Sequence, residues 1–374
     1  MSRNFPQVDP EGLLEYSVVF TDRAVNHMSQ LFQAAMRDLS AMLRQVYHGD
    51  AVAIVPGGGT FGMEAIARQL ASGRKCLVIR NGWFSYRWSQ IFEMGAIPAK
   101  ETVLKARPIS QAAQSPFAPP AIEDVEAAIR REQPDLVFAP HVETASGTIL
   151  PDAYLERVAA AVHAHGGLFV LDCVASGSMW VDMRARGVDV LLSAPQKAWS
   201  SVPCAALVVL SAEAQRRVSQ SRSTSFAADL NKWLQIMQAY ESGSHAYHAT
   251  MPTEPLMRLR DSMKDTLARG LEPLRQAHMR LGGNVRELLA RRGFPSVAAP
   301  GFEAPTVVVS YTEDPEIANA KRFAQLGLQA AAGVPLMCDE PESFRSFRIG
   351  LFGLDKLDDV DGAVARLNAV VQQL

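Results

Sequence analysis

The chain contains few cysteines and no long apolar run, and each absence excludes a class of protein. The sequence has four cysteines, which are far apart and lack the spacing of metal ligands: Cys76, Cys173, Cys204 and Cys338. No run of about 18 apolar residues occurs, as a membrane-spanning helix would need. The N-terminus also lacks the apolar core of a secretory signal. We therefore expect a cytoplasmic protein with reduced thiols and no membrane partner.

An excess of charge of either sign is also missing. Lys and Arg number 37 and Asp and Glu 39, which gives a formal net charge of −2. Proteins that bind nucleic acid carry a basic patch, so we expect no nucleic-acid partner. The 374 residues are 48% hydrophobic and 20% charged, which is typical of a soluble globular enzyme. This length permits one large domain and a smaller one.

A lysine follows an apolar, strand-like run near the middle of the chain. Residues 188–192 form this run, and Lys197 lies in the polar stretch 193–199 after it. Open α/β sheets bind their ligands at the carboxyl ends of their strands. A lysine amine that can lose its proton forms a Schiff base with a carbonyl, such as the aldehyde of pyridoxal phosphate. Lys197 is therefore the first candidate for a catalytic residue.

An aspartate ends the predicted strand that precedes this lysine. Residues 167–172 read as a buried strand with Asp172 at its carboxyl end. An ionised carboxylate there would keep a pyridine nitrogen protonated, and the protonated ring stabilises a carbanion at the substrate Cα. A lone aspartate at a strand end more often caps the next loop. Beside Lys197, we favour the role at the cofactor ring.

A glycine-rich turn opens a predicted helix upstream. The predicted strand 51–55 is followed by Gly58, Gly59 and Thr60, and then by a helix over 61–70. Glycines let the backbone approach a phosphate closely, and the free amides at a helix start attract an anion. Many doubly wound sheets carry such a turn for packing alone. Together with Lys197, the turn predicts a phosphate site to which Thr60 adds a hydroxyl donor.

These motifs together resemble the class V aminotransferases. The segments 141–147 and 347–350 complete a set that lies in the family's order, from about residue 50 to residue 353. The similarity is greatest to the alanine–glyoxylate and serine–pyruvate aminotransferases. It implies a pyridoxal 5'-phosphate enzyme of fold type I, an α/β fold with a mostly parallel seven-stranded sheet. We expect an N-terminal arm over 1–25, a large cofactor-binding domain over 26–255, and a small C-terminal α+β domain over 256–374.

The resemblance also implies which residues contact the cofactor. Phe84 would stack on the cofactor ring, with Trp83 as a rival for that role, and Val174 would pack on the other ring face. Thr144 matches a hydroxyl that binds the cofactor's 3′-oxygen or the region of its phosphate. Gln196 precedes the lysine, where cysteine desulfurases usually carry histidine, and this difference favours transamination.

Two further sites follow from the same resemblance. Arg348 would hold the substrate carboxylate, because a planar guanidinium binds a carboxylate through two parallel hydrogen bonds. Tyr247 and Thr250 resemble residues of a loop that reaches the cofactor phosphate of a partner subunit. We therefore expect a homodimer with shared active sites, and symmetric dimers are the commonest oligomers.

The reaction that this set of residues implies is transamination. Lys197, as a free amine, would move the Cα proton of the donor. We expect the donor to be a small amino acid of the alanine or serine type, and the acceptor a 2-oxo acid such as glyoxylate or pyruvate. Three alternatives stay open. They are a cysteine desulfurase or lyase that uses Cys338, an aminotransferase for an aminophosphonate or ureidoglycine donor, and a non-catalytic binding protein on this fold.

Apolar periodicity and turn residues predict the remaining elements. Helices are expected over 26–47, 122–131, 151–165, 231–240 and 253–292, and strands over 75–80, 136–139 and 204–210, the last antiparallel as in the family. The proline-rich stretch 105–120 predicts a surface loop. In the C-terminal part we expect strands over 306–310 and 346–351 and helices over 315–326 and 356–374.

Overall fold

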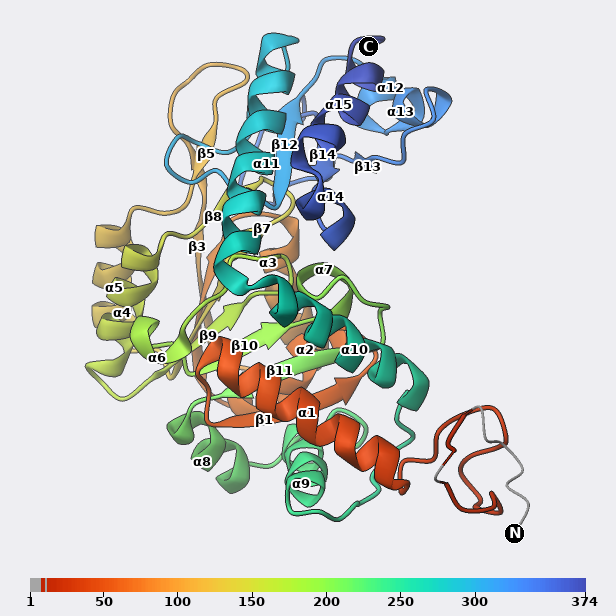
Figure 1. The fold of residues 1–374 in the computed structure, drawn as a ribbon. Coiled ribbons are helices and arrows are strands. Elements are labelled where there is room, and N and C mark those ends of the chain that lie inside the picture. Colours follow the sequence, from red (N-terminus) through yellow and green to blue (C-terminus); the bar gives the residue numbers. More distant parts are fainter. Residues whose placement is uncertain (1–7, 11) are drawn as a thin grey trace.

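The computed structural model describes residues 8–10 and 12–374, and its largest element is a seven-stranded sheet (Figure 1). The strand order is β1-β11-β10-β9-β6-β2-β3. Strand β11 pairs antiparallel with β1 and β10, and the other neighbours pair in parallel. The strands are β1 (Ala51–Pro56), β2 (Lys75–Arg80), β3 (Lys100–Lys105), β6 (Leu136–Pro140), β9 (Leu168–Asp172), β10 (Val190–Ser193) and β11 (Ala205–Leu210). The predicted mostly parallel, seven-stranded sheet is confirmed.

Helices cover this sheet, which explains why its central strands are continuous apolar runs. All residues of β10 and β11 are buried. Helix α2 packs on β10 and β11, α5 on β9, α3 on β2 and β6, and α9 on β1. The helices of this part are α1 (Gln30–Tyr47), α2 (Gly59–Ile66) with the π-helical turn η1 (Ala67–Ala71), α3 (Trp83–Gly95), α4 (Ile122–Glu132), α5 (Asp152–His163), α6 (Met183–Arg186), α7 (Pro195–Ala198), α8 (Ala212–Gln220) and α9 (Leu230–Glu241).

A second, three-stranded sheet lies above the large one in Figure 1, and its strand order is β12-β14-β13. Helix α10 packs its buried side chains into the core of the large sheet, whereas α11 and α15 pack into the core of the small one. The predicted domain boundary near residue 255 stays a prediction. The elements are α10 (Thr253–Arg269), α11 (Leu271–Arg291), β12 (Val307–Tyr311), α12 (Pro315–Ala318), α13 (Lys321–Gln325), β13 (Ala331–Ala332), β14 (Ser346–Gly350), α14 (Leu354–Asp358) and α15 (Val360–Val371).

Several predicted elements are interrupted in the structure. The expected helix over 253–292 is two helices, because Gly270 has a φ of 86° that breaks the first one. The expected helix over 315–326 is likewise split at Ala320, whose φ is 63°. The predicted loop 105–120 contains a short antiparallel ladder, β4 (Arg107–Pro108) with β5 (Phe117–Ala118). A similar short ladder joins β7 (Val142–Glu143) and β8 (Thr148–Ile149).

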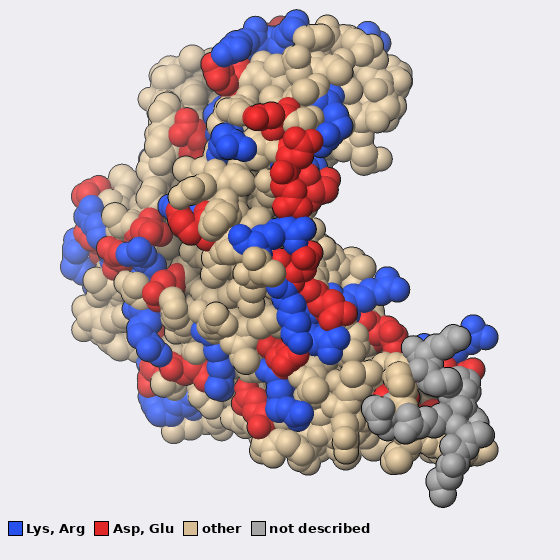
Figure 2. Space-filling view, in the orientation of Figure 1, with Lys and Arg blue, Asp and Glu red and all other residues tan. Residues whose placement is uncertain are grey.

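The described part of the N-terminal arm contains no helix or strand, and it extends from the start of α1 in Figure 1. Its side chains Leu13, Leu14, Tyr16 and Val18 are exposed. Over the face drawn in Figure 2, acidic and basic side chains are intermingled. Among the described residues, no helix is both long enough and apolar enough to cross a membrane. The four cysteines are buried and unpaired.

Candidate active site

The carboxyl edge of the large sheet brings most of the predicted site residues together. Asp172 ends β9, Lys197 lies in α7 directly after β10, and α2 begins directly after β1. One cavity joins these three places with the loop after β6. The predicted residues that line it are Gly59, Thr60, Phe84, Thr144, Asp172, Val174, Gln196 and Lys197.

Lys197 is held on a short helix that Pro195 starts after the end of β10, a position that proline favours. Its Nζ lies 5.9 Å from the ring centre of Phe84 and 5.6 Å from that of Phe352. Burial lowers the pKa of the Lys197 amine, while the negative charge of Asp172 opposes this effect. The amine therefore loses its proton more readily than an exposed lysine does, as a general base must.

Asp172 is a partly buried acid that faces the same cavity. Burial raises the pKa of its carboxyl to about 6, against a hydrogen bond from the Val174 amide and the charge of Lys197. The Val174 amide donates to Oδ1 at 2.9 Å, and the described residues give this side chain no other hydrogen bond. A cation bound in front of Asp172 would favour its ionised form.

The start of α2 offers free backbone donors. The amides of Gly58, Gly59 and Thr60 have no acceptor within the described part of the chain. A Cβ on Gly59 would lie 2.8 Å from Cγ2 of Val174, so only glycine fits there. A Cβ on Gly58 would meet nothing within 4 Å, and its extended backbone does not require glycine. Free amides at the positive end of a helix form an anion site.

The sequence analysis missed Arg87, which lines the same cavity. Its guanidinium donates to Oγ1 of Thr60 at 2.9 Å and lies 5.3 Å from the ring centre of Phe84. Phe84 and Arg87 are three residues apart on α3, and this spacing places both on one helix face. Arg87 therefore adds a positive charge beside the start of α2.

A second missed residue, Glu143, is a fully buried carboxylate. It accepts hydrogen bonds from the amides of Phe84 at 3.2 Å, Ser85 at 2.8 Å and Ala145 at 3.0 Å. The hydroxyl of Ser85 donates to it as well, at 2.7 Å. Glu143, on the short strand β7, thus caps α3 and fixes the backbone that carries Phe84.

Of the two aromatic candidates, Phe84 lies at the cavity and Trp83 does not. The Trp83 ring instead packs against Tyr86, with 5.8 Å between the ring centres. The Arg348 guanidinium carbon lies 5.4 Å from the centre of the Phe84 ring. The geometry favours Phe84 for the stacking role, which stays a prediction.

Arg348 lies on β14 of the small sheet and does not line the cavity itself, but its guanidinium is next to Phe84, which does. Its Nε donates to the carbonyl of Ala332 at 2.8 Å, and its two terminal nitrogens have no acceptor among the residues described. Burial lowers the pKa of the guanidinium, while the charge of Glu143 opposes this effect. A half-buried guanidinium with two free nitrogens suits a carboxylate or phosphonate ligand.

Tyr247 and Thr250 do not reach the cavity of their own chain. Their hydroxyl oxygens lie 3.4 Å apart, and the Tyr247 side chain is exposed. The two residues therefore form a pair on the surface of the single chain.

Cys338, the residue on which the desulfurase alternative depends, does not line the cavity either. Its Sγ donates to the carbonyl of Arg80 at 3.3 Å. Burial raises the pKa of the thiol to about 12. A buried, protonated thiol is a poor nucleophile, so the structure gives the desulfurase alternative no support.

Comparisons with known proteins point to one enzyme family. The family model described as aminotransferase class-V matches residues 11–290. The 2-aminoethylphosphonate–pyruvate transaminase 2 of Paraburkholderia xenovorans (strain LB400) is 27% identical over 352 residues, which cover 92% of this chain and 89% of the relative. The 2-aminoethylphosphonate–pyruvate transaminase 1 of Burkholderia lata is 27% identical over 370 residues, with coverages of 95% and 94%. The crystal structure of alanine–glyoxylate aminotransferase from Nostoc sp. has a TM-score of 0.77 at 23% identity and covers 93% of this chain and 89% of its own. The last likeness confirms the predicted fold.

Proposed function

The chain belongs to the class V aminotransferase family, and from this premise we propose that it transfers an amino group from a small donor to pyruvate or glyoxylate with pyridoxal 5'-phosphate as its cofactor. Membership of the family makes the chain an aminotransferase. One observation carries the finer proposal. Lys197, Asp172 and the free amides of α2 meet in a single cavity at the carboxyl edge of the sheet.

Three features of this cavity fit the cofactor. The free amides of Gly59 and Thr60, which line the cavity, suit the phosphate group, while Gly58 offers a further free amide next to it without lining the cavity. The Oε1 atom of Gln196 is buried without a hydrogen-bond partner and lines the cavity, so a polar group of the ligand can satisfy it. Asp172 is a partly buried acid with a raised pKa, and a protonated pyridine nitrogen would keep it ionised.

Each residue then has a defined task. When bound, pyridoxal 5'-phosphate supplies an aldehyde for attachment and a protonated ring that takes up electrons. Lys197 would hold the aldehyde and later, as a free amine, would move the Cα proton of the donor. Asp172 would keep the ring nitrogen protonated, and Phe84 and Val174 would pack against the ring. Thr144 and Gln196 offer polar groups to the cofactor.

Arg348 is proposed to orient the anionic group of both substrates. Replacing Arg348 with Ala is expected to raise KM for donor and acceptor at least about tenfold, because a charge-assisted bidentate contact is lost. Steady-state kinetics with each substrate varied would measure this change. Cofactor affinity should stay the same, since Arg348 belongs to the substrate end. An unchanged KM for both substrates would show that another group binds the anion.

The donor has two candidates. The resemblance to the alanine–glyoxylate and serine–pyruvate aminotransferases favours a small amino acid such as alanine or serine. The names of the relatives favour 2-aminoethylphosphonate, because the chain aligns with two such transaminases over more than nine-tenths of its length. A donor panel at fixed pyruvate, repeated at fixed glyoxylate, separates the candidates by kcat/KM. The proposal of a small donor fails if neither alanine, serine nor 2-aminoethylphosphonate is consumed.

We further propose that the enzyme is a homodimer in which Tyr247 and Thr250 complete the phosphate site of the partner subunit. The exposed arm side chains Leu13, Tyr16 and Val18 support an interface, because a single chain leaves them in water. The exposed hydroxyl pair of Tyr247 and Thr250 supports a role outside its own chain.

Mixed dimers test this sharing of residues. One subunit carries Lys197→Ala, and the other carries Tyr247→Phe with Thr250→Val. If the pair acts on the partner's site, each mixed dimer contains one intact site and should recover about half of the wild-type activity at limiting cofactor. Homodimers of either variant serve as controls. No recovery in the mixed dimer would place the pair in its own chain's site, and full activity of the Tyr247→Phe/Thr250→Val homodimer would show that the pair serves neither site.

A further inference from the structure

A second hollow lies at the opposite edge of the large sheet, where β6 and β9 begin. Its volume is about 590 Å³, within the range of small-molecule sites. Leu70, Leu136 and Leu168 are buried and form its apolar part. This hollow shares no residue with the Lys197 cavity. Its interpretation is therefore independent of the proposed function.

Positive charge is concentrated here. Arg74, Arg216, Arg217 and Arg222 line the hollow, and Asp135 is its only acidic lining residue among those described. Glu213 lies beside it on α8 and pairs with two of the arginines. Four guanidinium groups thus face two carboxylates, although the whole chain has a net charge of −2. This excess of positive charge is confined to the hollow, and the composition of the whole chain does not predict it.

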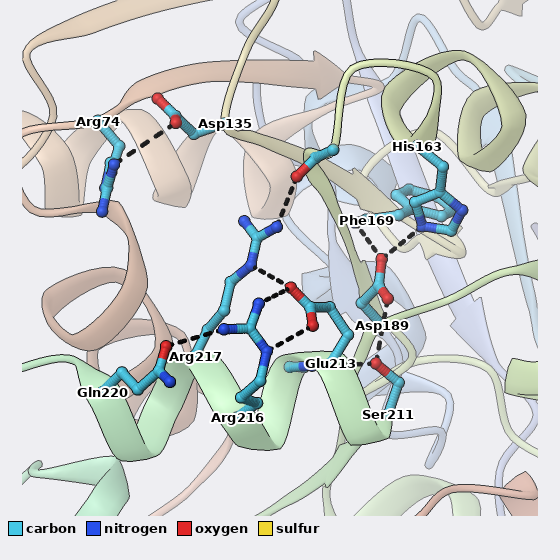
Figure 3. Close-up of polar contacts among 12 residues, drawn as sticks. Arg74, Asp135, His163, Phe169, Asp189, Ser211, Glu213, Arg216, Arg217 and Gln220 are labelled. Carbon is cyan, nitrogen blue, oxygen red and sulfur yellow. Dashed lines mark hydrogen bonds and ion pairs between the residues drawn. The ribbon is translucent and has the colours of Figure 1, made fainter.

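Two of the arginines are held in place by Glu213 (Figure 3). The Arg216 guanidinium binds its carboxylate through two nitrogens, at 2.9 and 2.6 Å, and binds Oε1 of Gln220 at 2.9 Å. Arg217 donates its Nε to the same carboxylate at 2.8 Å and a terminal nitrogen to the carbonyl of Gly166 at 2.5 Å. These contacts hold the Arg216 and Arg217 side chains in place at one side of the hollow and do not fill it.

The other two arginines have almost no partner. Arg222 makes no ion pair or hydrogen bond through its guanidinium within the described chain. Arg74 lies 3.7 Å from Oδ1 of Asp135, whose Oδ2 accepts the Lys75 amide at 2.9 Å. The two guanidinium groups are therefore available to a ligand.

The nearest further acid in Figure 3, Asp189, is already satisfied. It accepts the Phe169 amide at 2.8 Å and binds His163 at 2.7 Å and the Ser211 hydroxyl at 3.1 Å. These three partners occupy both of its oxygens, so Asp189 does not pair with the arginines of the hollow.

We propose that this hollow binds a phosphate dianion, either free or as the phosphate group of a small monoester. Guanidinium groups match phosphate oxygens through paired hydrogen bonds. The net excess of two positive charges matches the charge of the ligand. Arg74 and Arg222 supply the direct bonds, and Arg216 and Arg217 add to the local potential.

Isothermal titration of the cofactor-saturated protein tests this proposal, because the cofactor then fills the phosphate site of the Lys197 cavity. The probes are inorganic phosphate and glycerol 3-phosphate. We expect one saturable site per chain. The variant Arg74→Ala/Arg222→Ala should weaken binding about tenfold or more for each guanidinium removed. The control variant Arg184→Ala/Arg366→Ala also removes two positive charges, but from exposed ion pairs outside the hollow. It should bind phosphate as the wild type does.

Each result of the titration either supports or overturns the proposed phosphate site. Tighter binding of the ester identifies an esterified ligand and equal binding identifies free phosphate, and both support the site. The single variant Arg222→Ala removes a guanidinium without a partner in the described chain, so its loss of affinity cannot be assigned to misfolding. Absence of saturable binding overturns the proposal. Equal weakening in the control variant overturns it too, because binding would then depend on overall charge alone.

Discussion

Replacing Lys197 with Ala is expected to abolish covalent retention of pyridoxal 5'-phosphate and to lower kcat by about 10²- to 10⁴-fold or more, since the variant also loses its general base. The physical reason is that this amine, on α7 directly after β10, is the group that attaches the aldehyde, and burial lowers its pKa although the charge of Asp172 opposes this. Borohydride reduction followed by intact mass spectrometry measures the attachment. The wild type should gain the mass of one reduced cofactor per chain and the variant none.

The matched control for this experiment is Lys232→Ala. Lys232 lies on α9 and contacts only the exposed Gln235 through its amine, within the described chain. It should retain the cofactor as the wild type does. Equal covalent labelling of the Lys197→Ala variant would contradict the assignment of Lys197 as the residue that attaches the cofactor. Membership of the family would then describe the fold of the chain but not this site.

Replacing Asp172 with Asn is expected to act in opposite directions on catalysis and on stability. The rate should fall at least about 10²-fold, because the ring nitrogen loses the charge that keeps it protonated. The cofactor-free protein should become more stable at neutral pH. A pKa raised from 3.8 to about 6 means that ionised Asp172 costs the fold at most about 3 kcal/mol. Asn carries no such cost and keeps the bond from the Val174 amide.

The pH dependence of this gain follows from linkage. Below pH 3.8, Asp172 is protonated in both the folded and the unfolded chain, and the substitution changes little. As pH rises toward 6, the unfolded chain releases the proton first, so the wild type loses stability relative to the variant. The advantage of Asn is therefore full above pH 6 and absent at low pH. Urea unfolding of the cofactor-free proteins at several pH values measures it. A variant less stable than the wild type at neutral pH would contradict a raised pKa of the Asp172 carboxyl.

The sequence alone predicted the central part of the fold. Strands such as β9 and β10 are buried on both faces and therefore read as short apolar runs. Because the carboxyl ends of such strands meet at one edge of the sheet, the positions of Asp172 and Lys197 along the chain are enough to pair them. The glycine turn before α2 could also be predicted from the sequence, since backbone amides need no particular side chain to bind an anion.

Other features depend on contacts between distant segments and left no local signal. Glu143 caps α3 from strand β7, which is far along the chain, and α3 itself was not predicted. Arg87 is a candidate only because that helix places it beside Thr60. The arginine hollow combines the start of β2, the start of β9 and the unpredicted helix α8. The edge strand β3 was not predicted, because its sequence is polar. Only its pairing with β2 identifies it as a strand.

The measurement that tests the central claim most directly is the absorbance spectrum of the purified, cofactor-saturated protein during half-reactions. The account predicts a visible band from the lysine-bound cofactor. One donor from the panel of alanine, serine and 2-aminoethylphosphonate should bleach this band, and pyruvate or glyoxylate should restore it. A protein without the band, or a band that no donor changes, would contradict transamination at Lys197.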